Sequence, residues 1–269
     1  MKLSIVIVNY KTPALLKLCI NSIQESSQNL KPEIIVVDSQ SQEETQEMLR
    51  EDFPDVSFFP FEENVGYSRA VNLGLKKSSG QYILVLNADI ISFEGTISKM
   101  VNFMENHSQV GMIGPQLINF NNTVQDSCYQ FITPKTILYR RTFLGRLPFA
   151  KKTLRNFLMK DWNHQSTRQV DWLLGAALMV RRAALDKIGL MDERFFLYCE
   201  DVDWSRRFWE KGYQVVYFPE AKMAHYHRRL SADRKGILGI FNPATRIHIK
   251  SALKYFFKYD FKNHKVVKS

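Results

Sequence analysis

The sequence predicts an α/β fold with a mainly parallel, mixed sheet and helices on both faces. In the first half of the chain, apolar runs of strand length alternate with amphipathic segments of helical length. The runs are almost uniformly apolar, which is typical of strands that are buried on both faces. With 269 residues, 45% of them hydrophobic and 24% charged, the chain suits one α/β domain with an appendage.

The elements of this first half are expected in alternating order. The predicted strands are LSIVIVN (residues 3–9), EIIVVD (33–38), VSFFPF (56–61) and YILVLN (82–87). The predicted helices cover residues 13–26, 42–50, 67–77 and 93–106. Sheets made of such βαβ units bind ligands at the carboxyl ends of their strands.

Polar residues follow each of the predicted strands. They are Asn9, Tyr10, Asp38, Ser39, Asn64, Asn87 and Asp89. Asn and Asp are common in turns, so each of them alone has a purely structural explanation. Because four strand ends carry them together, we expect a ligand site at this edge of the sheet.

The turns after the strands exclude some nucleotide motifs. The first turn, NYKTPALLKL, contains no glycine, which disfavours both a dinucleotide-binding G-x-G-x-x-G motif and a P-loop. Asp38 could still accept hydrogen bonds from a ribose or a pyrimidine. In ENVGYSRAVNLGL, Gly66 permits a tight turn, and Arg69 follows in the first helical turns, where it could reach a phosphate.

The stretch MDERFFLYCEDVDWSRR, residues 191–207, combines five carboxylates with aromatic side chains. Apolar residues recur at helical spacing after it, so a helix should begin near Glu200 or Asp201. Acidic residues stabilise a helix N-terminus, and Asp203 with Arg207 makes an i,i+4 pair, which is a structural explanation. The functional explanation is a carboxylate that is brought to a cleft. Further along, YQVVYFP predicts another strand, which His225 follows.

The net charge of +10 is unevenly distributed. Residues 1–221 hold 25 basic and 25 acidic residues, whereas residues 222–269 hold 12 and 2. A second basic segment, residues 134–168, has 9 basic residues against Asp161 alone. Such patches favour nucleic acid, an anionic membrane surface or a phosphorylated substrate without choosing between them. We expect no nucleic acid partner, because no recognised reader motif is present.

The C-terminal tail predicts a basic amphipathic helix over residues 242–259. Lys250, Lys254 and Lys258 recur at spacings of four beside a broad apolar face. Such a helix could dock on its own domain, on the partner of a homodimer or on an anionic membrane surface. No apolar run approaches the roughly 20 residues that a membrane span needs, and the N-terminus reads as a strand, so we expect a cytoplasmic protein. Three scattered cysteines, Cys19, Cys128 and Cys199, argue against a disulfide framework.

Six segments together resemble, in this order, a family 2 glycosyltransferase of the GT-A fold. They are SIVIVNY, VVDSQS, ENVGYSRAVNLGL, LNADI, VDWLLGAALMVRRAAL and MDERFFLYCEDVDWSRR, and the resemblance covers roughly Leu3 to His227. The chain is similar to the rhamnosyltransferase-like branch that builds bacterial surface polysaccharides. The resemblance implies a nucleotide-diphosphate-sugar donor such as dTDP-rhamnose, a divalent metal (Mg²⁺ or Mn²⁺), and inverting transfer to an acceptor hydroxyl, as on a lipid-linked saccharide.

The resemblance also implies domain boundaries and residue roles. A GT-A domain would cover residues 1–228, with a nucleotide-sugar half (1–118) and an acceptor half (119–228), and residues 229–269 would be a basic extension. The donor would bind at Asn9, Tyr10, Asp38, Asn64, Gly66, Arg69, Asn87 and Asp89. The acceptor would contact Asp171, Trp172, Gly175 and Glu200. Asp201 would be the general base, and Asp89 with His225 would hold the metal, with His227 as the fallback.

Two departures from the family pattern keep alternatives open. The family's metal motif is usually D-x-D or N-x-D, and Asn87-Ala88-Asp89 has only one carboxylate where the D-x-D form has two, although Mg²⁺ is commonly held by one carboxylate, waters and phosphates. Ser39 replaces a frequent asparagine. A binding protein that keeps the nucleotide-sugar pocket without catalysis is therefore the alternative function. A sugar-phosphate nucleotidyltransferase is disfavoured, because NYKTPALLKL lacks its glycine-rich loop. Residues 119–168 predict either a loop-rich insertion or a wall of the acceptor site.

Overall fold

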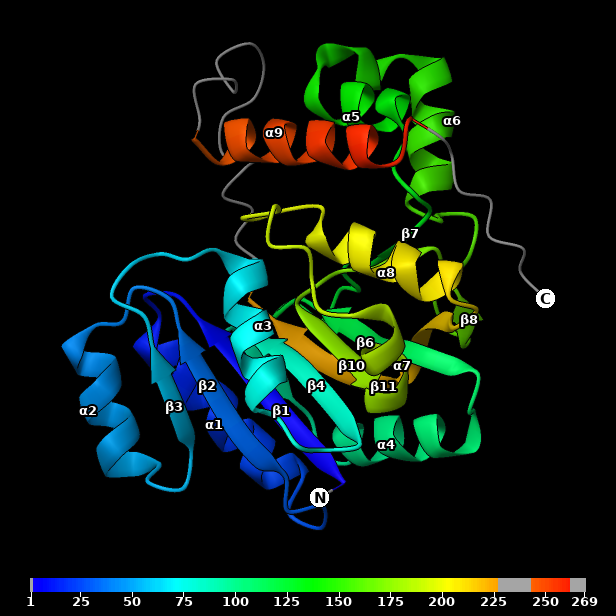
Figure 1. Cartoon of the computed structure of the whole chain (residues 1–269). Coiled ribbons are helices and arrows are strands. Elements are labelled where there is room, and N and C mark those ends of the chain that lie inside the picture. The colour runs from blue at the N-terminus through cyan, green and yellow to red at the C-terminus, as the bar shows by residue number, and fades with distance from the viewer. Residues whose placement is uncertain (1, 227–242, 262–269) are drawn as a thin grey trace.

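The computed structural model describes residues 2–226 and 243–261, which form an α/β structure (Figure 1). The strands are β1 Leu3–Asn9, β2 Glu33–Asp38, β3 Ser57–Pro60, β4 Tyr82–Asn87, β5 Ile90–Ser92, β6 Val110–Ile118, β7 Cys128–Tyr129, β8 Arg168–Gln169, β9 Trp172–Leu173, β10 Ala177–Arg181 and β11 Gln214–His225. The helices are α1 Pro13–Ser26, α2 Glu43–Asp52, α3 Tyr67–Lys77, α4 Thr96–Asn106, α5 Pro134–Arg141, the 3-10 helix η1 Phe143–Arg146, α6 Pro148–Phe157, α7 Arg182–Ile188, α8 Glu200–Glu210 and α9 Pro243–Lys258.

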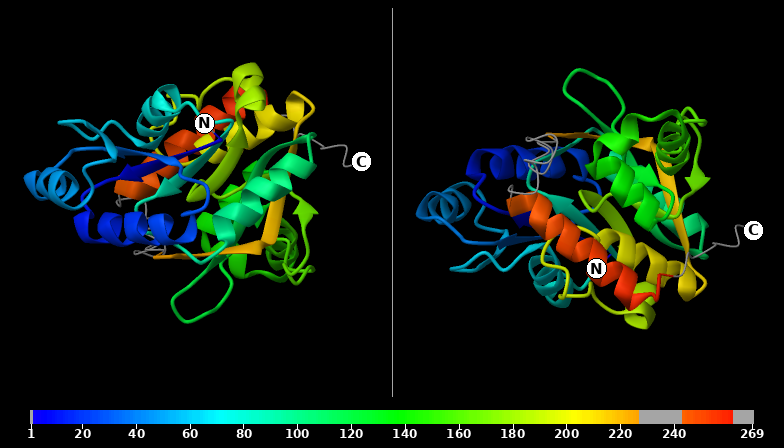
Figure 2. Two further views of the ribbon diagram at one scale, coloured as in Figure 1. Left: turned by 90° about the horizontal axis from the view of Figure 1, so that it is seen from below. Right: turned by 90° about the horizontal axis from the view of Figure 1, so that it is seen from above.

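The predicted α/β fold is confirmed, with a mostly parallel first half of the sheet. The strand order is β3-β2-β1-β4-β10-β6-β11-β5, with β8 paired to β11. Strand β1 is parallel to β2 and β4, and β2 is parallel to β3. Helices α1 and α4 pack on one face of the sheet, and α3, α7 and α8 pack on the other (Figure 2). Every residue of β1 is buried, as its uniformly apolar sequence predicts.

The second half closes the sheet with antiparallel and parallel pairings. Strand β10 runs antiparallel between β4 and β6, and β11 then runs parallel to β6. The end of β11 turns to pair with β5, so that His225 lies opposite Ile90. This pairing brings the carboxyl end of β11 to the residue that follows Asp89.

Sequence patterns did not predict β6. Its sequence, VGMIGPQLI, contains the glycines and the proline that usually mark a turn. The structure gives a packing reason for the glycines. A Cβ at Gly111 would lie 2.6 Å from the Phe208 ring, and one at Gly114 would lie 3.2 Å from Leu173. The small residues let α8 and β9 approach the strand closely.

The segment 119–168, for which a loop-rich insertion was one prediction, contains α5, η1 and α6. These helices have only 4 to 10 residues, so a periodic pattern has little length in which to show. Local signals mark where they begin. Pro134 and Pro148 occupy the first turn of α5 and α6, and the Thr133 side chain accepts a hydrogen bond from Thr136 N. None of the helices in the described part of the chain is long and apolar enough to cross a membrane.

Helix α9 lies where the tail helix was predicted, and it packs on its own domain. Ala252, Tyr255 and Phe256 join an apolar cluster with residues of β7, β9 and α8. One side of α9 also contacts the loop between α7 and α8. Ser251 Oγ donates to Leu197 O (2.8 Å), Lys254 Nζ donates to Arg194 O, and Lys258 Nζ pairs with Asp192 (2.7 Å). Two of the three tail lysines therefore make contacts within the protein.

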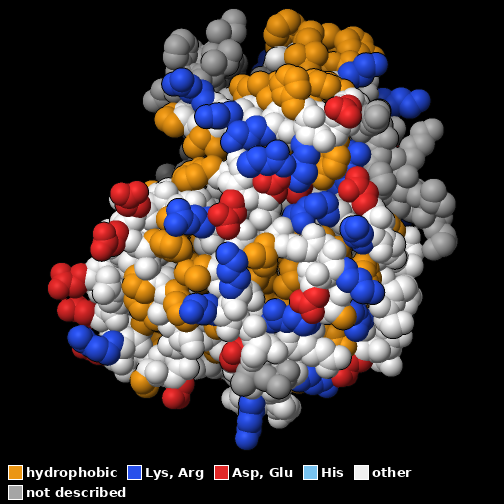
Figure 3. All heavy atoms as spheres, in the orientation of Figure 1, with side chains coloured by type: hydrophobic (Ala, Val, Ile, Leu, Met, Phe, Trp, Pro, Cys, Tyr) orange, Lys and Arg blue, Asp and Glu red, His pale blue; other side chains and the backbone are white. Residues whose placement is uncertain are grey.

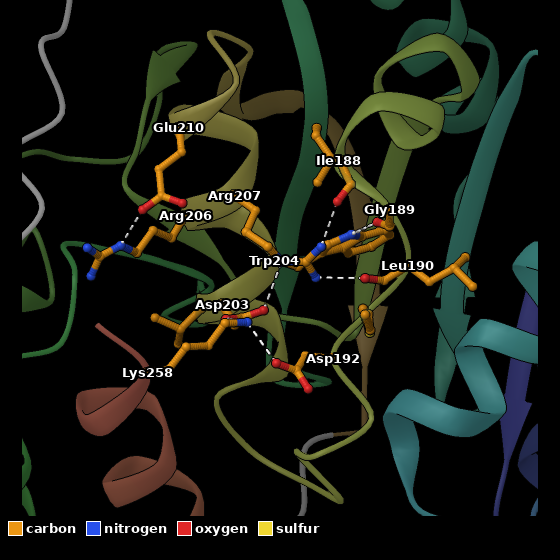
Figure 4. A network of polar contacts seen from close by, with 12 residues as sticks. Ile188, Gly189, Leu190, Asp192, Asp203, Trp204, Arg206, Arg207, Glu210 and Lys258 are labelled. Carbon is orange, nitrogen blue, oxygen red and sulfur yellow. Dashed lines mark hydrogen bonds and ion pairs between the residues drawn. The ribbon is translucent and has the colours of Figure 1, made fainter. Parts of the chain in front are cut away.

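A fully buried carboxylate, Asp203, connects α8 to α9 (Figure 4). Its Oδ2 accepts a hydrogen bond from Arg207 Nε (2.9 Å), which confirms the predicted i,i+4 pair. Its Oδ1 accepts from Tyr259 OH (2.7 Å) and pairs with Lys258. Arg207 also donates to the carbonyls of Ile188 and Leu190, at the end of α7. The network thus holds α7, α8 and α9 in one arrangement.

We expect Asp203→Ala to lower the free energy of unfolding by roughly 3 to 5 kcal/mol, because it removes the carboxylate partner of the largely buried Arg207 and the acceptor of the Tyr259 hydroxyl. Asp161→Ala is the control, since the Arg155–Asp161 pair is 63% and 66% exposed and such pairs contribute at most about 1 kcal/mol. Urea denaturation of both variants measures the difference. Equal and small losses would show that Asp203 does not hold the helices together.

Candidate active site

A cavity of about 360 Å³ lies at the carboxyl edge of the central strands. Seven of the predicted site residues line it, namely Asn87, Asp89, Trp172, Gly175, Glu200, Asp201 and His225. Sequence reasoning did not single out four others, Tyr67, Arg140, Tyr198 and His248. The acidic pair Glu200–Asp201 and the pair Asp89–His225 come from three separate segments of the chain and share this one cavity.

The turn that precedes α8 and the first residues of α8 line the cavity. Tyr198 and Cys199 have φ angles of 70° and 69°, in the left-handed region that residues other than glycine rarely adopt. Two such residues in succession are strained, and strain of this kind gathers at functional sites. Contacts from α9 hold the turn, because the Tyr198 ring lies 5.0 Å from the His248 ring. Helix α8 then begins at Glu200, as predicted.

Asp201 is held by two backbone N–H groups. Gly175 N donates to its Oδ2 (3.1 Å), and Val202 N donates to its Oδ1 (2.9 Å). Gly175 lies between β9 and β10, and the Tyr67 hydroxyl donates to its carbonyl. The carboxylate is therefore fixed on the cavity wall by the helix N-terminus on one side and by the sheet on the other.

The two adjacent acids differ in their protonation. Burial raises the pKa of Asp201 to about 6, while the N–H groups of Gly175 and Val202 act in the opposite direction. Burial raises the pKa of Glu200 well above its usual value, and the neighbouring charge of Asp201 raises it further. Glu200 Oε2 is buried and has no hydrogen-bond partner among the described residues. Of the two acids, Asp201 is therefore the one that ionises more readily, and Glu200 is the one that more readily keeps its proton.

Asp89 and His225 are brought together by the pairing of β5 with β11. His225 Nε2 lies 3.5 Å from Asp89 Oδ1, and Tyr226 N donates to the Asp89 carbonyl. Asp89 Oδ1 is buried and lacks a hydrogen-bond partner within the described residues. A carboxylate oxygen and an imidazole nitrogen at this separation fit a divalent cation. No cluster of three or more potential ligand side chains occurs in the described ranges, and the fallback His227 lies outside them.

Gln125 fixes the orientation of His225, and nothing in its sequence context, VQDS, could have identified it. Its amide nitrogen donates to two oxygens, His225 O (2.8 Å) and Asn119 Oδ1 (2.7 Å). Backbone carbonyls fix the orientation of both side-chain amides. His225 O accepts from the Gln125 amide nitrogen, and Thr123 O accepts from Asn119 Nδ2. Gln125 Oε1 must therefore accept the proton on His225 Nδ1 (2.9 Å). When the imidazole is neutral, this hydrogen bond leaves the lone pair on Nε2, which lies toward Asp89.

The predicted donor residues of the first strands form a second polar cluster beside the cavity. Asn9 Nδ2 donates to Asp38 Oδ1 (2.8 Å) across the ends of β1 and β2. Ser39 Oγ donates to Asn64 Oδ1 (3.2 Å) and accepts from Val65 N, so this serine supports the turn before α3. Burial raises the pKa of Asp38.

Gly66 immediately precedes α3, and its position has no room for a side chain. Its φ angle is 79°, and a Cβ there would lie 2.5 Å from Phe196 O. Asn64 Oδ1 accepts a hydrogen bond from its N–H (3.0 Å). Tyr10 and Arg69 are exposed beside this cluster, with the Arg69 guanidinium 5.6 Å from the centre of the Phe61 ring.

The remaining acceptor residues separate into two groups. Trp172 lines the cavity, and its ring stacks on Tyr129 at 4.3 Å between centroids. Asp171 is not among the lining residues, and its carboxylate accepts a hydrogen bond from Phe131 N (2.8 Å).

Comparison with known proteins connects this geometry to a family. The family model described as Glycosyl transferase family 2 matches residues 4–189. An N-acetylglucosaminyl-diphospho-decaprenol L-rhamnosyltransferase of Mycobacterium tuberculosis is 28% identical over 240 residues, which are 84% of this chain and 74% of that protein. The low-salt glycan biosynthesis hexosyltransferase Agl10 of Haloferax volcanii is 27% identical over 210 residues, or 76% of this chain and 61% of that protein.

Solved structures share the fold at low sequence identity. GalNAc-T7 with UDP, GalNAc and Mn²⁺ superposes with a TM-score of 0.68 at 16% identity, over 96% of this chain and 48% of that one. The mannosyltransferase PcManGT of Pyrobaculum calidifontis, in complex with GDP-Man and Mn²⁺, gives a TM-score of 0.61 at 16% identity, over 98% and 65%. This chain thus spans about half of the GalNAc-T7 structure. The predicted resemblance is confirmed: the chain belongs to glycosyl transferase family 2, and it is a GT-A hexosyltransferase with rhamnosyltransferase-like relatives.

Proposed function

We propose that this enzyme transfers a sugar, with inversion, from a nucleotide-diphosphate-sugar to a hydroxyl of a lipid-linked saccharide in bacterial surface polysaccharide synthesis. The observation that carries the proposal is the pair of buried acids at the start of α8, of which Asp201 is held by two N–H groups and ionises more readily. The activity for which the mycobacterial relative is named supports rhamnose as the sugar and a polyprenyl-linked acceptor. The donor is then dTDP-rhamnose or a similar nucleotide-sugar.

The donor would lie along the carboxyl edge of the sheet. Asp38 and Asn9 would receive the nucleoside, and Gly66 with Arg69 at the start of α3 would lie nearer to the phosphates. Asn87 and Asp89 continue the same edge into the cavity. The neighbouring structures bind UDP and GDP-mannose, so this chain's base specificity is part of the proposal.

Asp201 would act as the general base of a single displacement. Its carboxylate takes the proton of the acceptor hydroxyl while that oxygen attacks the anomeric carbon. The bond from the anomeric carbon to the diphosphate breaks at the same time, and the nucleoside diphosphate leaves on the opposite side. One in-line displacement inverts the anomeric configuration. In its neutral form, Glu200 would donate a hydrogen bond to the acceptor. Trp172 and Arg140 would form part of the wall of the acceptor site.

A divalent metal fits between Asp89 and His225. Those two side chains would hold it, and when bound it would neutralise negative charge on the diphosphate. Gln125 holds the His225 ring in the tautomer that such a role requires. The single carboxylate of Asn87-Ala88-Asp89 also favours the second candidate, a nucleotide-sugar-binding protein without turnover.

A membrane-linked acceptor would place the enzyme at the inner face of the cell membrane. Peripheral attachment is therefore a further part of this proposal. The homodimer, which was one of the alternatives for the tail helix, stays a prediction. The division at residue 228 into a GT-A domain and a basic extension also stays a prediction, because residues 227–242 lie outside the described ranges.

Asp201→Asn keeps the volume of the side chain and removes its basicity. We expect the transfer rate to fall by about 10² to 10⁴, with donor binding and melting temperature close to wild type. The wild-type rate should also decline as the pH falls below about 6, because a protonated Asp201 cannot accept the proton. Single-turnover transfer measured from pH 5 to 8 tests both statements.

Glu200→Gln is the matched control, because it resembles the neutral form of Glu200. It should keep the pH dependence of the wild type. Normal transfer by Asp201→Asn together with an inactive Glu200→Gln would reverse the two roles. Donor binding without turnover in the wild type, whichever acceptor is offered, would favour the binding protein.

Asp89→Ala should abolish the gain in nucleotide affinity that a divalent ion provides. The measurement is a thermal-shift panel of UDP-, GDP- and dTDP-sugars with Mn²⁺ or with EDTA, since a ligand that binds only the folded state raises the melting temperature. Asp55→Ala, at an exposed position, is the control. If the wild type binds equally well with EDTA and with Mn²⁺, the metal proposal fails.

In the metal-free protein, we expect the neutral imidazole of His225 to carry its proton on Nδ1. The ¹⁵N chemical shifts of its ring report this directly, with no metal or substrate present. Gln125→Leu removes the acceptor, so the ring should populate both tautomers and Mn²⁺ affinity should fall by about 10 to 100 fold. A proton found on Nε2 in the wild type would contradict the assigned relay.

A further inference from the structure

Exposed hydrophobic side chains gather at one end of the molecule. We call residues 134–158 and 243–261, which contain α5, η1, α6 and α9, the helical cap. Seven of the fourteen large hydrophobic side chains that are exposed in the described chain belong to it, although it is about a sixth of the sequence. They are Leu138, Phe143, Leu147, Phe149, Leu253, Phe257 and Phe261. Such a concentration marks an interaction surface, whereas scattered exposed residues need no explanation.

The exposed side chains of α9 lie opposite its packed side. Its buried residues, among them Ala252, Tyr255 and Phe256, face the protein, and Leu253 and Phe257 point away from it at 49% and 69% exposure. In Figure 1 α9 and the α5–α6 helices lie at the same end, and the view from above in Figure 2 shows them beside each other. Figure 3 shows the hydrophobic side chains collected over this end.

The charge of the helical cap is strongly positive. It contains eleven lysines and arginines and a single acidic residue, Asp260. Lys151 and Lys152 are exposed on α6, and Arg246 and Lys250 are exposed on α9. Exposed aromatic side chains combined with basic ones are the composition of helices that lie in the interface of an anionic bilayer.

The helical cap also contributes to the wall of the cavity. Ile137 and Arg140 of α5 line the cavity from one side, and His248 of α9 lines it from the other. The two most exposed large hydrophobic side chains of the described residues are Phe143 (74%), in η1 directly after α5, and Phe257 (69%), in α9. The two segments that carry these side chains therefore also contribute to the wall of the cavity that contains Asp201.

We propose that the helical cap is a membrane-docking surface for an anionic lipid bilayer, in which Phe143 and Phe257 enter the interface on the two sides of the cavity and the basic residues contact lipid phosphates. The inference rests on the proposed transfer to a lipid-linked acceptor, and it states how that acceptor reaches the site. The diphosphate head of the acceptor lipid would enter the cavity between α5 and α9 while its chain stays in the bilayer. Lys258 and Lys254, which bind Asp192 and Arg194, are not needed for docking.

The test is co-sedimentation of the full chain with vesicles of phosphatidylglycerol and phosphatidylcholine, and with vesicles of phosphatidylcholine alone. The wild type should bind the anionic vesicles, and Phe143→Ser/Phe257→Ser should bind them at least tenfold more weakly, because two exposed aromatic side chains no longer transfer out of water. Leu18→Ser on α1, which is 51% exposed and lies away from the helical cap, is the control.

Reversing the charge of basic residues in the helical cap is a second, independent test of vesicle binding. Each basic residue near an anionic membrane contributes a factor of about five, so Lys151→Glu/Lys152→Glu should weaken binding by more than about tenfold at low salt. The difference should shrink as salt screens the surface. Arg50→Glu/Lys76→Glu changes the net charge equally outside the helical cap, and it should leave more binding intact.

Two results would overturn the inference: a wild type that does not sediment with anionic vesicles, or cap variants that bind as well as the wild type. A dimer that the same Phe variants dissociate in sedimentation velocity, without vesicle binding, would instead make the helical cap a contact between two copies. The nucleotide-sugar thermal shift separates this inference from the proposed function. If vesicle binding depends on the cap but no nucleotide-sugar binds, the docking surface stands and the proposed function fails.

Discussion

The buried carboxylate of Asp203 is the constraint on which the arrangement of the acceptor half depends. An ionised group with no exposed surface must keep its cationic partners, and those partners come from α8 itself and from α9. The same α9 holds the loop that leads into α8 through Ser251 and Lys254. The first turn of α8 carries Asp201. The position of the proposed base is therefore set by a helix that follows it by more than forty residues, and not by local sequence alone.

The acids Glu200 and Asp201 show how local hydrogen bonds divide a pair of equally buried groups. Both are removed from water, which raises the pKa of each. Asp201 receives two backbone N–H groups, whereas Glu200 Oε2 finds no partner in the described structure. The ionised form is consequently concentrated on Asp201. At the other side of the cavity, backbone carbonyls decide the tautomer of His225 through Gln125. In both cases backbone groups decide where a proton lies: which of two acids holds it, or which ring nitrogen of a neutral imidazole carries it.

Local patterns predicted the first half of the fold to within a few residues, because β1, β2 and β4 are continuous apolar runs and α1 and α3 have regular periodicity. The same strand ends identified Asn87 and Asp89, which line the cavity. Patterns failed at β6, where glycines serve close packing, and at the short helices of residues 134–157. Gln125, Arg140 and His248 could not be found from sequence, since their importance comes from contacts between segments that are far apart in the chain.

The pairing of β5 with β11 has a consequence for the order of assembly. Strand β5 has three residues, and it borders the sheet only after β11 has joined β6. Contacts between segments so distant in sequence form late, because a large part of the chain must be confined before they contribute. The nucleotide half can therefore gather its parallel strands while the chain is still emerging from the ribosome. The Asp89–His225 pair cannot form at that stage, because His225 lies at the end of β11. A nascent or truncated chain would therefore have the strand ends of the nucleotide-sugar half but would lack this pair and the acids of α8.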